Sequence, residues 1–116
     1  MIRVKRVYEP YEASDGPRFL VDRLWPRGVT KNGLHLEAWL KELAPSNELR
    51  RWFCHDPDRW EEFCRRYHAE LDSNGSMWTP LAKMAENRDI TLLFAARDTE
   101  HNNATVLKAY LERRMA

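Results

Sequence analysis

Residues 20–28 read Leu20-Val21-Asp22-Arg23-Leu24-Trp25-Pro26-Arg27-Gly28, an apolar run that changes abruptly into charge, an indole, a proline and a glycine. The pattern predicts a buried strand over about Arg18 to Leu24. Pro26 fixes its own φ and biases Trp25 toward an extended conformation, so we expect the strand to end there. Gly28 permits a sharp exit from the turn without a Cβ penalty. Because open α/β sheets bind ligands outside the carboxyl ends of their strands, this strand end is a candidate site.

Length and composition limit the possible classes of protein. The 116 residues predict a single domain over 1–116, and 43% apolar with 32% charged residues is ordinary for a globular chain. Nineteen basic and 18 acidic residues leave a net charge of +1, so no overall field recruits nucleic acid. The basic pairs, such as Arg65-Arg66, fit solvated helix faces. We expect no nucleic-acid partner, and any anion binding must be local.

Signals for export and for membrane insertion are missing from the sequence. Residues 1–6 lack the apolar segment of a signal peptide, and no run approaches the roughly 20 apolar residues that a membrane span needs. The two cysteines, Cys54 and Cys64, do not form a disulfide framework. We therefore expect a cytoplasmic protein with reduced thiols and no membrane contact, and the oligomeric state is left open.

Two further strands are predicted near the ends of the chain. Ile2 to Tyr8 alternates apolar and basic residues, which is typical of an edge strand or of a strand with one solvated face. Ile90 to Ala96 is a continuous apolar run, which indicates a buried parallel strand. Glu9 to Pro17 and Thr30 to Gly33 are polar and rich in turn residues, so we expect loops there.

Helical periodicity marks the middle of the chain. From Leu36 to Leu43, apolar residues at i, i+3, i+4 and i+7 predict a helix that Pro45 ends. Ser46 is suited to N-cap a short helix, and Asp56-Pro57 is an N-cap followed by proline at the first helical position. The next helix carries the cleanest apolar stripe, which Asn74-Gly75 ends: Trp60, Phe63, Cys64, Tyr67 and Leu71.

Two more helices complete the prediction. One runs from about Thr79 to Asn87, and the last places Ala104, Leu107 and Leu111 on its core face. We expect the core to be led by Trp39, Trp52, Trp60, Phe63 and Tyr67. The order of elements predicts an α/β fold, a single-domain sandwich with a small, mostly parallel sheet flanked by helices.

Several motifs give the chain a family resemblance. They are Val21 to Gly28, Lys41 to Ser46 with Glu48-Leu49-Arg50, and Thr91-Leu92-Leu93 with Asn102 to Leu107. Together they resemble the YeaO-like branch of the bacterial domain-of-unknown-function 488 family, over nearly the whole chain. The resemblance implies a small cytoplasmic α/β protein and no particular activity. The family's other branch carries cysteine, glutamate, histidine and arginine around the last strand; residues 94–103 here contain no cysteine, which argues against thiol chemistry at that point.

The first candidate site is an anion pocket at the end of the second strand. Arg23 and Arg27 present planar forks of donors that match phosphate or carboxylate, and Lys31 or Arg50 would join them. Asp22 would orient Arg23 or accept a proton from a bound hydroxyl, and Trp25 would stack on a flat group. The alternative is a structural network of ion pairs that pins the turn to neighbouring helices.

The second candidate follows the last strand, at the same sheet edge if the two strands run parallel. Asp98 or Thr99 would begin a helix whose amides face a bound anion, and Asn102 would orient the substrate. In an enzyme, Asp22 or Asp98 would be the general base. The alternative for Asp98 is helix capping, whereas Asn102 is expected inside the first turn rather than at the cap.

Metal and cofactor sites are not predicted. Cys64 and His68 lie four residues apart, with Cys54 and His55 nearby, but Cys64 belongs to the apolar stripe and no close pair of ligands is present. The chain contains neither Gly-x-Gly-x-x-Gly nor a Walker loop, so neither a dinucleotide cofactor nor triphosphate hydrolysis is expected in its usual form, and no cofactor is predicted. Two functions stay open: an enzyme acting on a small phosphorylated or nucleotide-like substrate, and a non-catalytic module that recognises an anion, a peptide or a nucleic-acid end.

Overall fold

A four-stranded parallel sheet forms the centre of the molecule. A computed structural model describes residues 1–115. The strands are β1 (Ile2–Arg6), β2 (Arg18–Leu20), β3 (Ala38–Trp39) and β4 (Ile90–Phe94), in the order β1-β4-β2-β3. Each neighbouring pair is parallel, so the carboxyl ends of the strands meet at one edge. The predicted α/β class is confirmed, and β1 is an edge strand as expected.

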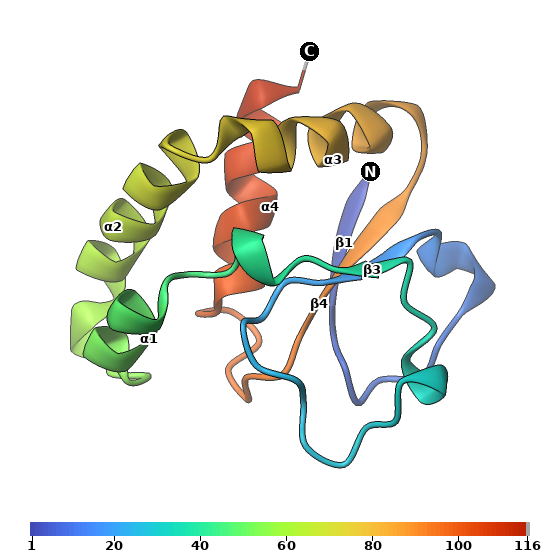
Figure 1. Ribbon diagram of the computed structural model, residues 1–116, viewed down its shortest axis with the longest axis horizontal. Coiled ribbons are helices and arrows are strands. Elements are labelled where there is room, and N and C mark those ends of the chain that lie inside the picture. Colours follow the sequence, from blue (N-terminus) through green and yellow to red (C-terminus); the bar gives the residue numbers. More distant parts are fainter. Residues whose placement is uncertain (116) are drawn as a thin grey trace.

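Helices and loops cover different faces of this sheet. The helices are α1 (Asn47–Phe53), α2 (Trp60–Asp72), α3 (Gly75–Asn87) and α4 (Asn103–Arg114). In Figure 1, α1 and α2 lie at the left, α3 lies at the top and α4 runs down near the centre, and the long connections on either side of β2 fill the lower right. The connections contain single turns of 3-10 helix: η1 (Ala13–Asp15), η2 (Asn32–Leu34), η3 (Lys41–Leu43) and η4 (Pro57–Arg59).

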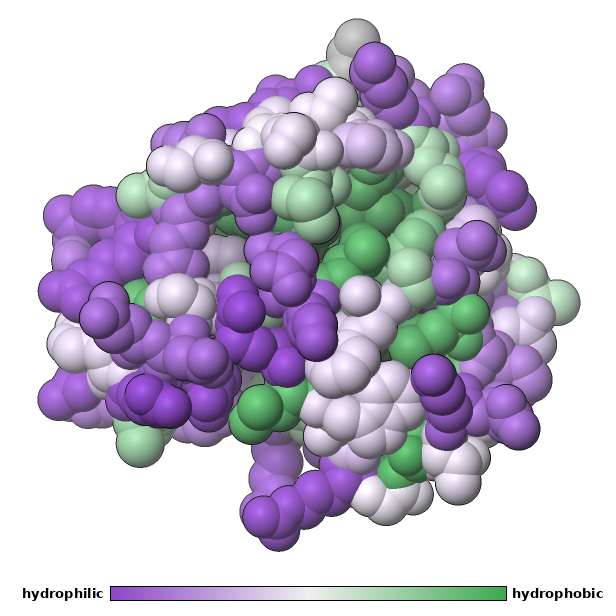
Figure 2. All heavy atoms as spheres, in the orientation of Figure 1, coloured by the Kyte–Doolittle hydropathy of each residue, from purple (hydrophilic) through white to green (hydrophobic). Residues whose placement is uncertain are grey.

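Strand β4 lies inside the sheet, between β1 and β2, and its sequence is apolar except for Thr91. Leu92 and Phe94 belong to the main core beneath the helices, and Leu93 belongs to a smaller core beneath the loops. All five residues of β4 are buried, because both faces of the strand are covered. On the face in Figure 2, hydrophilic side chains cover α1 and α2 at the left, and apolar side chains emerge mainly farther right.

Two of the predicted helix starts are confirmed by their hydrogen bonds. The Ser46 hydroxyl accepts a hydrogen bond from the backbone N–H of Leu49 at 3.1 Å and caps α1. The Asp56 carboxylate accepts from the N–H of Asp58 at 3.0 Å, one turn before α2. Asn74 lies between α2 and α3, so the break after α2 is also confirmed, but α3 begins at Gly75 rather than near Thr79 and contains Pro80.

The predicted helix over Leu36 to Leu43 is wrong. This segment forms β3 and the single turn η3. Backbone bonds from Glu37 N to the Arg18 carbonyl (2.7 Å) and from Leu40 N to the Leu20 carbonyl (2.8 Å) tie it to β2. An open sheet edge offered these bonds, and tertiary pairing outweighed the helical spacing.

Trp39 is accordingly not a core residue, because 36% of it is exposed. Phe63 and Tyr67 are buried, and Trp52 and Trp60 are partly buried against the main core. The core therefore lies under α2 and α4 more than under the segment before α1. None of the helices in residues 1–115 is long and apolar enough to cross a membrane.

Candidate functional site

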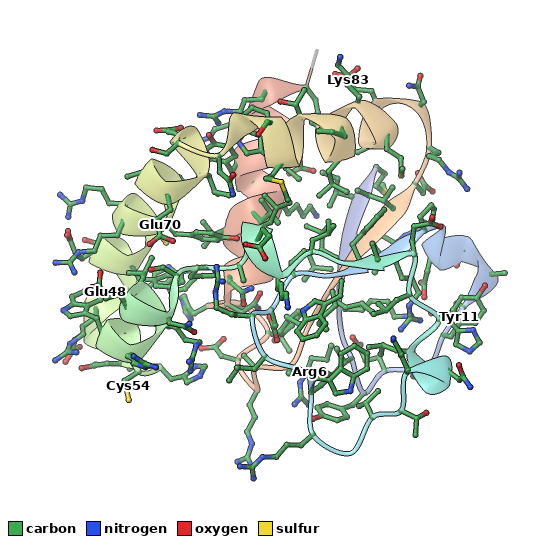
Figure 3. All side chains as sticks on the ribbon, in the orientation of Figure 1. Arg6, Tyr11, Glu48, Cys54, Glu70 and Lys83 are labelled. Carbon is green, nitrogen blue, oxygen red and sulfur yellow. The ribbon has the colours of Figure 1, made fainter. Side chains whose placement is uncertain are left out.

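A pocket of about 630 Å³ opens at the carboxyl edge of the sheet. Segments that follow β1, β2 and β4 form it together with α1 and its C-terminal end. In Figure 3 it lies between the labelled Cys54, at the end of α1, and Arg6, at the end of β1. Its lining includes Tyr8, Asp22, Arg23, Leu24, Trp25, Pro26, Arg27, Pro45, Arg50, Arg51, Phe53, Cys54, His55, Phe63, Ala95, Ala96, His101, Asn102 and Asn103.

Asp22 is the acidic residue of this pocket. Its carboxylate accepts hydrogen bonds from the backbone N–H of Ala95 at 2.9 Å and from the side-chain amide of Asn103 at 3.1 Å. Burial raises the pKa of the Asp22 carboxyl above its ordinary value, and these two bonds and the charge of His55 offset part of the increase. The N–H of Ala95, just after β4, thus bonds to the Asp22 side chain rather than to a backbone carbonyl of β2. The backbone pairing of the two strands ends there, and β2 is shorter than predicted.

Arg23 is held by backbone carbonyls rather than by Asp22. Its Nε donates to the Pro45 carbonyl at 3.1 Å and its Nη2 donates to the Ala44 carbonyl at 3.3 Å. These bonds attach the end of β2 to the segment that leads into α1. Arg23 therefore pins the turn after β2 to the segment before α1, although through backbone carbonyls and not through ion pairs, and it also lines the pocket.

Trp25 closes the turn after β2. Its Nε1 donates to the Val29 carbonyl at 2.8 Å, and its ring meets Trp39 edge to face at 5.4 Å between centroids. Gly28 has φ +74°, as the need for a sharp exit predicted. The indole N–H is thus already hydrogen-bonded, and the ring contributes an apolar surface to the pocket.

Arg50 lines the pocket from α1. Its Nη2 donates to Asn47 Oδ1 at 3.3 Å, whereas its Nε is buried without a hydrogen-bond partner. The first turn of α1 is rigidly placed, because the Glu70 carboxylate accepts from both the N–H (2.8 Å) and the hydroxyl (2.6 Å) of Ser46. The backbone that carries Arg50 is thus anchored to α2, and one donor of the Arg50 guanidinium is bonded to Asn47 within the same helix.

The remaining predicted ligand-binding residues differ in position. Arg27 and Arg51 line the pocket and are exposed. Lys31 is exposed near η2, and it does not belong to the residues that line the pocket. The structure thus brings Arg23, Trp25, Arg27 and Arg50 together, and it leaves Lys31 apart.

Asn102 is the N-cap of α4, which corrects the expectation that it lies inside the first turn. Its Oδ1 accepts from Thr105 N at 3.0 Å and its Nδ2 donates to the Asp98 carbonyl at 3.0 Å. Sequence reasoning placed the helix start too early because Asp98 also forms a cap-like turn. The Asp98 carboxylate accepts from Glu100 N and His101 N, both at 2.9 Å, and these bonds lower its pKa.

Asp98 is exposed and does not line the pocket, so of the two proposed bases only Asp22 does. Sequence reasoning also missed pocket residues at the end of α1. Cys54 (φ +47°) and His55 (φ +55°) are consecutive left-handed residues, which is uncommon for side chains with a Cβ. The Asp56-Pro57 start could have signalled a tight turn before it, although not its direction.

Basic side chains outnumber acidic ones in the lining of the pocket. Four arginines and two histidines line it with a single carboxylate, whose two oxygens already accept hydrogen bonds. The start of α4 contributes to the same surface through Asn102 and Asn103. Within residues 1–115, no group of three or more His, Cys, Asp or Glu side chains is placed to hold a metal ion.

Comparison with known proteins relates the whole chain to one family. Residues 1–116 match a family model described as the inactive DUF488-N3 subclade. The uncharacterized protein YeaO of Escherichia coli K12 is 46% identical over 110 residues, which cover 95% of this chain and 96% of YeaO. The uncharacterized protein Rv3073c of Mycobacterium tuberculosis H37Rv is 40% identical, covering 97% of this chain and 95% of that protein. No solved structure gives a significant match.

Proposed function

Because the chain belongs to the YeaO-like DUF488 family and matches its inactive N3 subclade, we propose that it is a non-catalytic module that binds a small phosphate-like anion. The binding site is the pocket at the carboxyl edge of the sheet. The observation that carries the proposal is the gathering of four arginines in one pocket whose single carboxylate, that of Asp22, already accepts two hydrogen bonds. An anion would accept hydrogen bonds from the guanidinium groups that Asp22 does not bind.

The roles of the pocket residues follow from their contacts. Arg50 donates to the anion, and Arg27 and Arg51 add charge at the exposed rim. Arg23 shapes the wall, since two of its donors bind backbone carbonyls. The proposal places the protein in the cytoplasm, where phosphorylated metabolites occur and where Cys54 and Cys64 remain free thiols.

Thermal unfolding with and without inorganic phosphate tests the proposal. A ligand that binds only the folded state raises the melting temperature by mass action, so phosphate is expected to stabilise the wild type in a concentration-dependent way. Arg50→Gln is expected to remove this response while circular dichroism shows an unchanged fold. Arg65→Gln is the control, because it removes the same charge from α2 outside the pocket, where Arg65 pairs with Glu62. Equal stabilisation of all three proteins would refute the pocket.

A second candidate function is an enzyme with Asp22 as its general base. The raised pKa of Asp22 in a pocket with arginines favours it, because a raised pKa makes a carboxylate a better base. Asp98 is a poorer base, since its hydrogen bonds lower its pKa. The test is turnover of a phosphorylated metabolite by the wild type and by Asp22→Asn. If the wild type turns it over and Asp22→Asn does not, although the variant still binds phosphate, this enzyme proposal replaces the binding proposal.

A further inference from the structure

The size of the pocket and its apolar lining indicate what kind of ligand fits it. A volume of about 630 Å³ falls within the range of pockets that hold whole organic ligands, and it is larger than a bare inorganic anion needs. Much of the lining is apolar, including Leu24, Pro26, Phe53 and Ala96. The arginines alone therefore do not account for this pocket.

Aromatic and apolar side chains come to the pocket from two separate parts of the chain. On the helical side, Phe53 stacks on Phe63 with 4.4 Å between ring centroids, and the imidazole of His55 lies 5.9 Å from Phe53. On the loop side, Leu24 is 57% exposed and Trp25 follows it. Phe53 is 8% exposed, so a small part of its ring is open to the pocket, and with Leu24 on the other side this apolar surface suits a flat ring in the ligand.

The polar atoms of the ring-bearing wall are already bonded. Trp25 Nε1 donates to Val29, and the Tyr8 hydroxyl donates to the Arg27 carbonyl at 3.0 Å. These side chains therefore offer ring faces and edges rather than hydrogen bonds. A ligand would gain apolar contact from them and charge-assisted bonds from the arginines.

The anion and ring subsites lie next to each other on α1. Arg50 and Phe53 are three residues apart in one helix and both line the pocket, so they share a helix face. Side chains at this spacing have Cβ atoms about 5–6 Å apart. That separation suits a phosphate group and the ring of its own ester.

We infer that the ligand of this pocket is a phosphate monoester whose alcohol carries a flat ring, such as a nucleoside monophosphate or an aryl phosphate. This inference rests on the proposed anion site. Arg50 takes the phosphate group, and the ring lies between Phe53 and the segment Leu24–Pro26. Asp22 and Asn103 line the same pocket and are hydrogen-bonded to each other.

Equilibrium binding with four phosphates tests the inference: adenosine monophosphate, phenyl phosphate, glycerol phosphate and inorganic phosphate. The two ring-bearing esters are expected to bind about tenfold or more tightly than the other two, which is the order of one ring stacked on an aromatic side chain. Similar affinities for all four, lost in Arg50→Gln, would overturn the ring subsite and leave the anion site standing. Binding of none of them would overturn both.

Two further measurements locate the ring. Phe53→Leu keeps an apolar side chain but loses the aromatic face, and it is expected to abolish the preference for ring-bearing esters without changing the affinity for inorganic phosphate. Trp52→Leu is the matched control, because Trp52 precedes Phe53 on α1 but contacts Arg59 and Arg66 instead of the pocket. A preference that survives in Phe53→Leu refutes the assignment. If that variant does not fold, Leu24→Ser decides, because Leu24 is 57% exposed on the opposite wall and its loss is expected to weaken the preference for ring-bearing esters. A preference that Leu24→Ser leaves unchanged then refutes the ring subsite.

Discussion

The side-chain amide of Asn103 donates to the Asp22 carboxylate at 3.1 Å and to the Val21 carbonyl at 2.8 Å. One residue in the first turn of α4 thus holds the end of β2, and Asp22 in turn holds the N–H of Ala95 just after β4. This link positions three of the segments that line the pocket. It also gives Asp22 a structural task, whatever chemistry the pocket performs.

Loss of this link is expected to be costly. Asn103→Ala removes two hydrogen bonds, one of them to a buried carboxylate, and should reduce the free energy of unfolding by about 1–3 kcal/mol. Urea denaturation measures the change. Asn87→Ala is the control, because Asn87 is exposed and donates only to the Lys83 carbonyl of its own helix at 3.2 Å. Equal effects of the two substitutions would show that the link contributes nothing.

The raised pKa of Asp22 predicts the sign of a pH effect. Burial favours the protonated carboxyl in the folded state, so the contribution of Asp22 to stability is fully present below its ordinary pKa of 3.8 and is lost as the pH rises through the raised pKa. The unfolding free energy of the wild type minus that of Asp22→Asn should therefore fall as the pH rises from about 3.8 toward neutrality. Urea titrations across this range test it. A difference that grows with pH would mean that the arginines, not burial, dominate the environment of Asp22.

The two glycines with positive φ differ in what a side chain would meet. Gly28 (φ +74°) has open space around its Cβ position, so Gly28→Ala should cost only the strain of a left-handed residue, about 1–2 kcal/mol. Gly16 has φ +65° and ψ −159°, a region almost restricted to glycine, and an added Cβ would clash with the Asp89 carbonyl oxygen. Gly16→Ala should therefore lower the melting temperature much more than Gly28→Ala. The reverse order would contradict the close approach of these two backbone segments.

The position of the core predicts which aromatic residues matter for stability. Phe63 is 3% exposed between Phe53, Trp60 and Tyr67, so Phe63→Ala should cost about 3–5 kcal/mol. Trp39→Ala should cost clearly less, because this ring is 36% exposed and its main attachments are one hydrogen bond to the Asp22 carbonyl and the contact with Trp25. Chemical denaturation of both variants compares them directly. A larger loss of unfolding free energy in the Trp39 variant than in the Phe63 variant would mean that Trp39 belongs to the core, as the helical spacing predicted.

Features that depend on neighbouring residues could be read from the amino-acid sequence. The apolar run Ile90 to Ala96 predicted a buried parallel strand, of which Ile90–Phe94 forms β4. Ser46 and Asp56 predicted helix starts, and Gly28 predicted a sharp exit from its turn. Each of these rests on a local feature: a run of apolar side chains, one capping bond, or the φ that a residue can adopt. The α/β class followed from the order in which such signals occur.

Features that depend on distant partners could not be read in this way. The segment Leu36–Leu43 forms a strand and a turn because β2 had an open edge. Arg23 donates to the carbonyls of Ala44 and Pro45, which lie 21 and 22 residues farther along the chain and come close to it only in the folded protein. Asp22 reached Ala95, 73 residues away, and thereby joined the pocket, while Asp98 and Lys31 stayed outside it. A side chain's hydrogen-bond partner is chosen among all the groups that folding brings within about 3 Å, and that set exists only once the chain has packed.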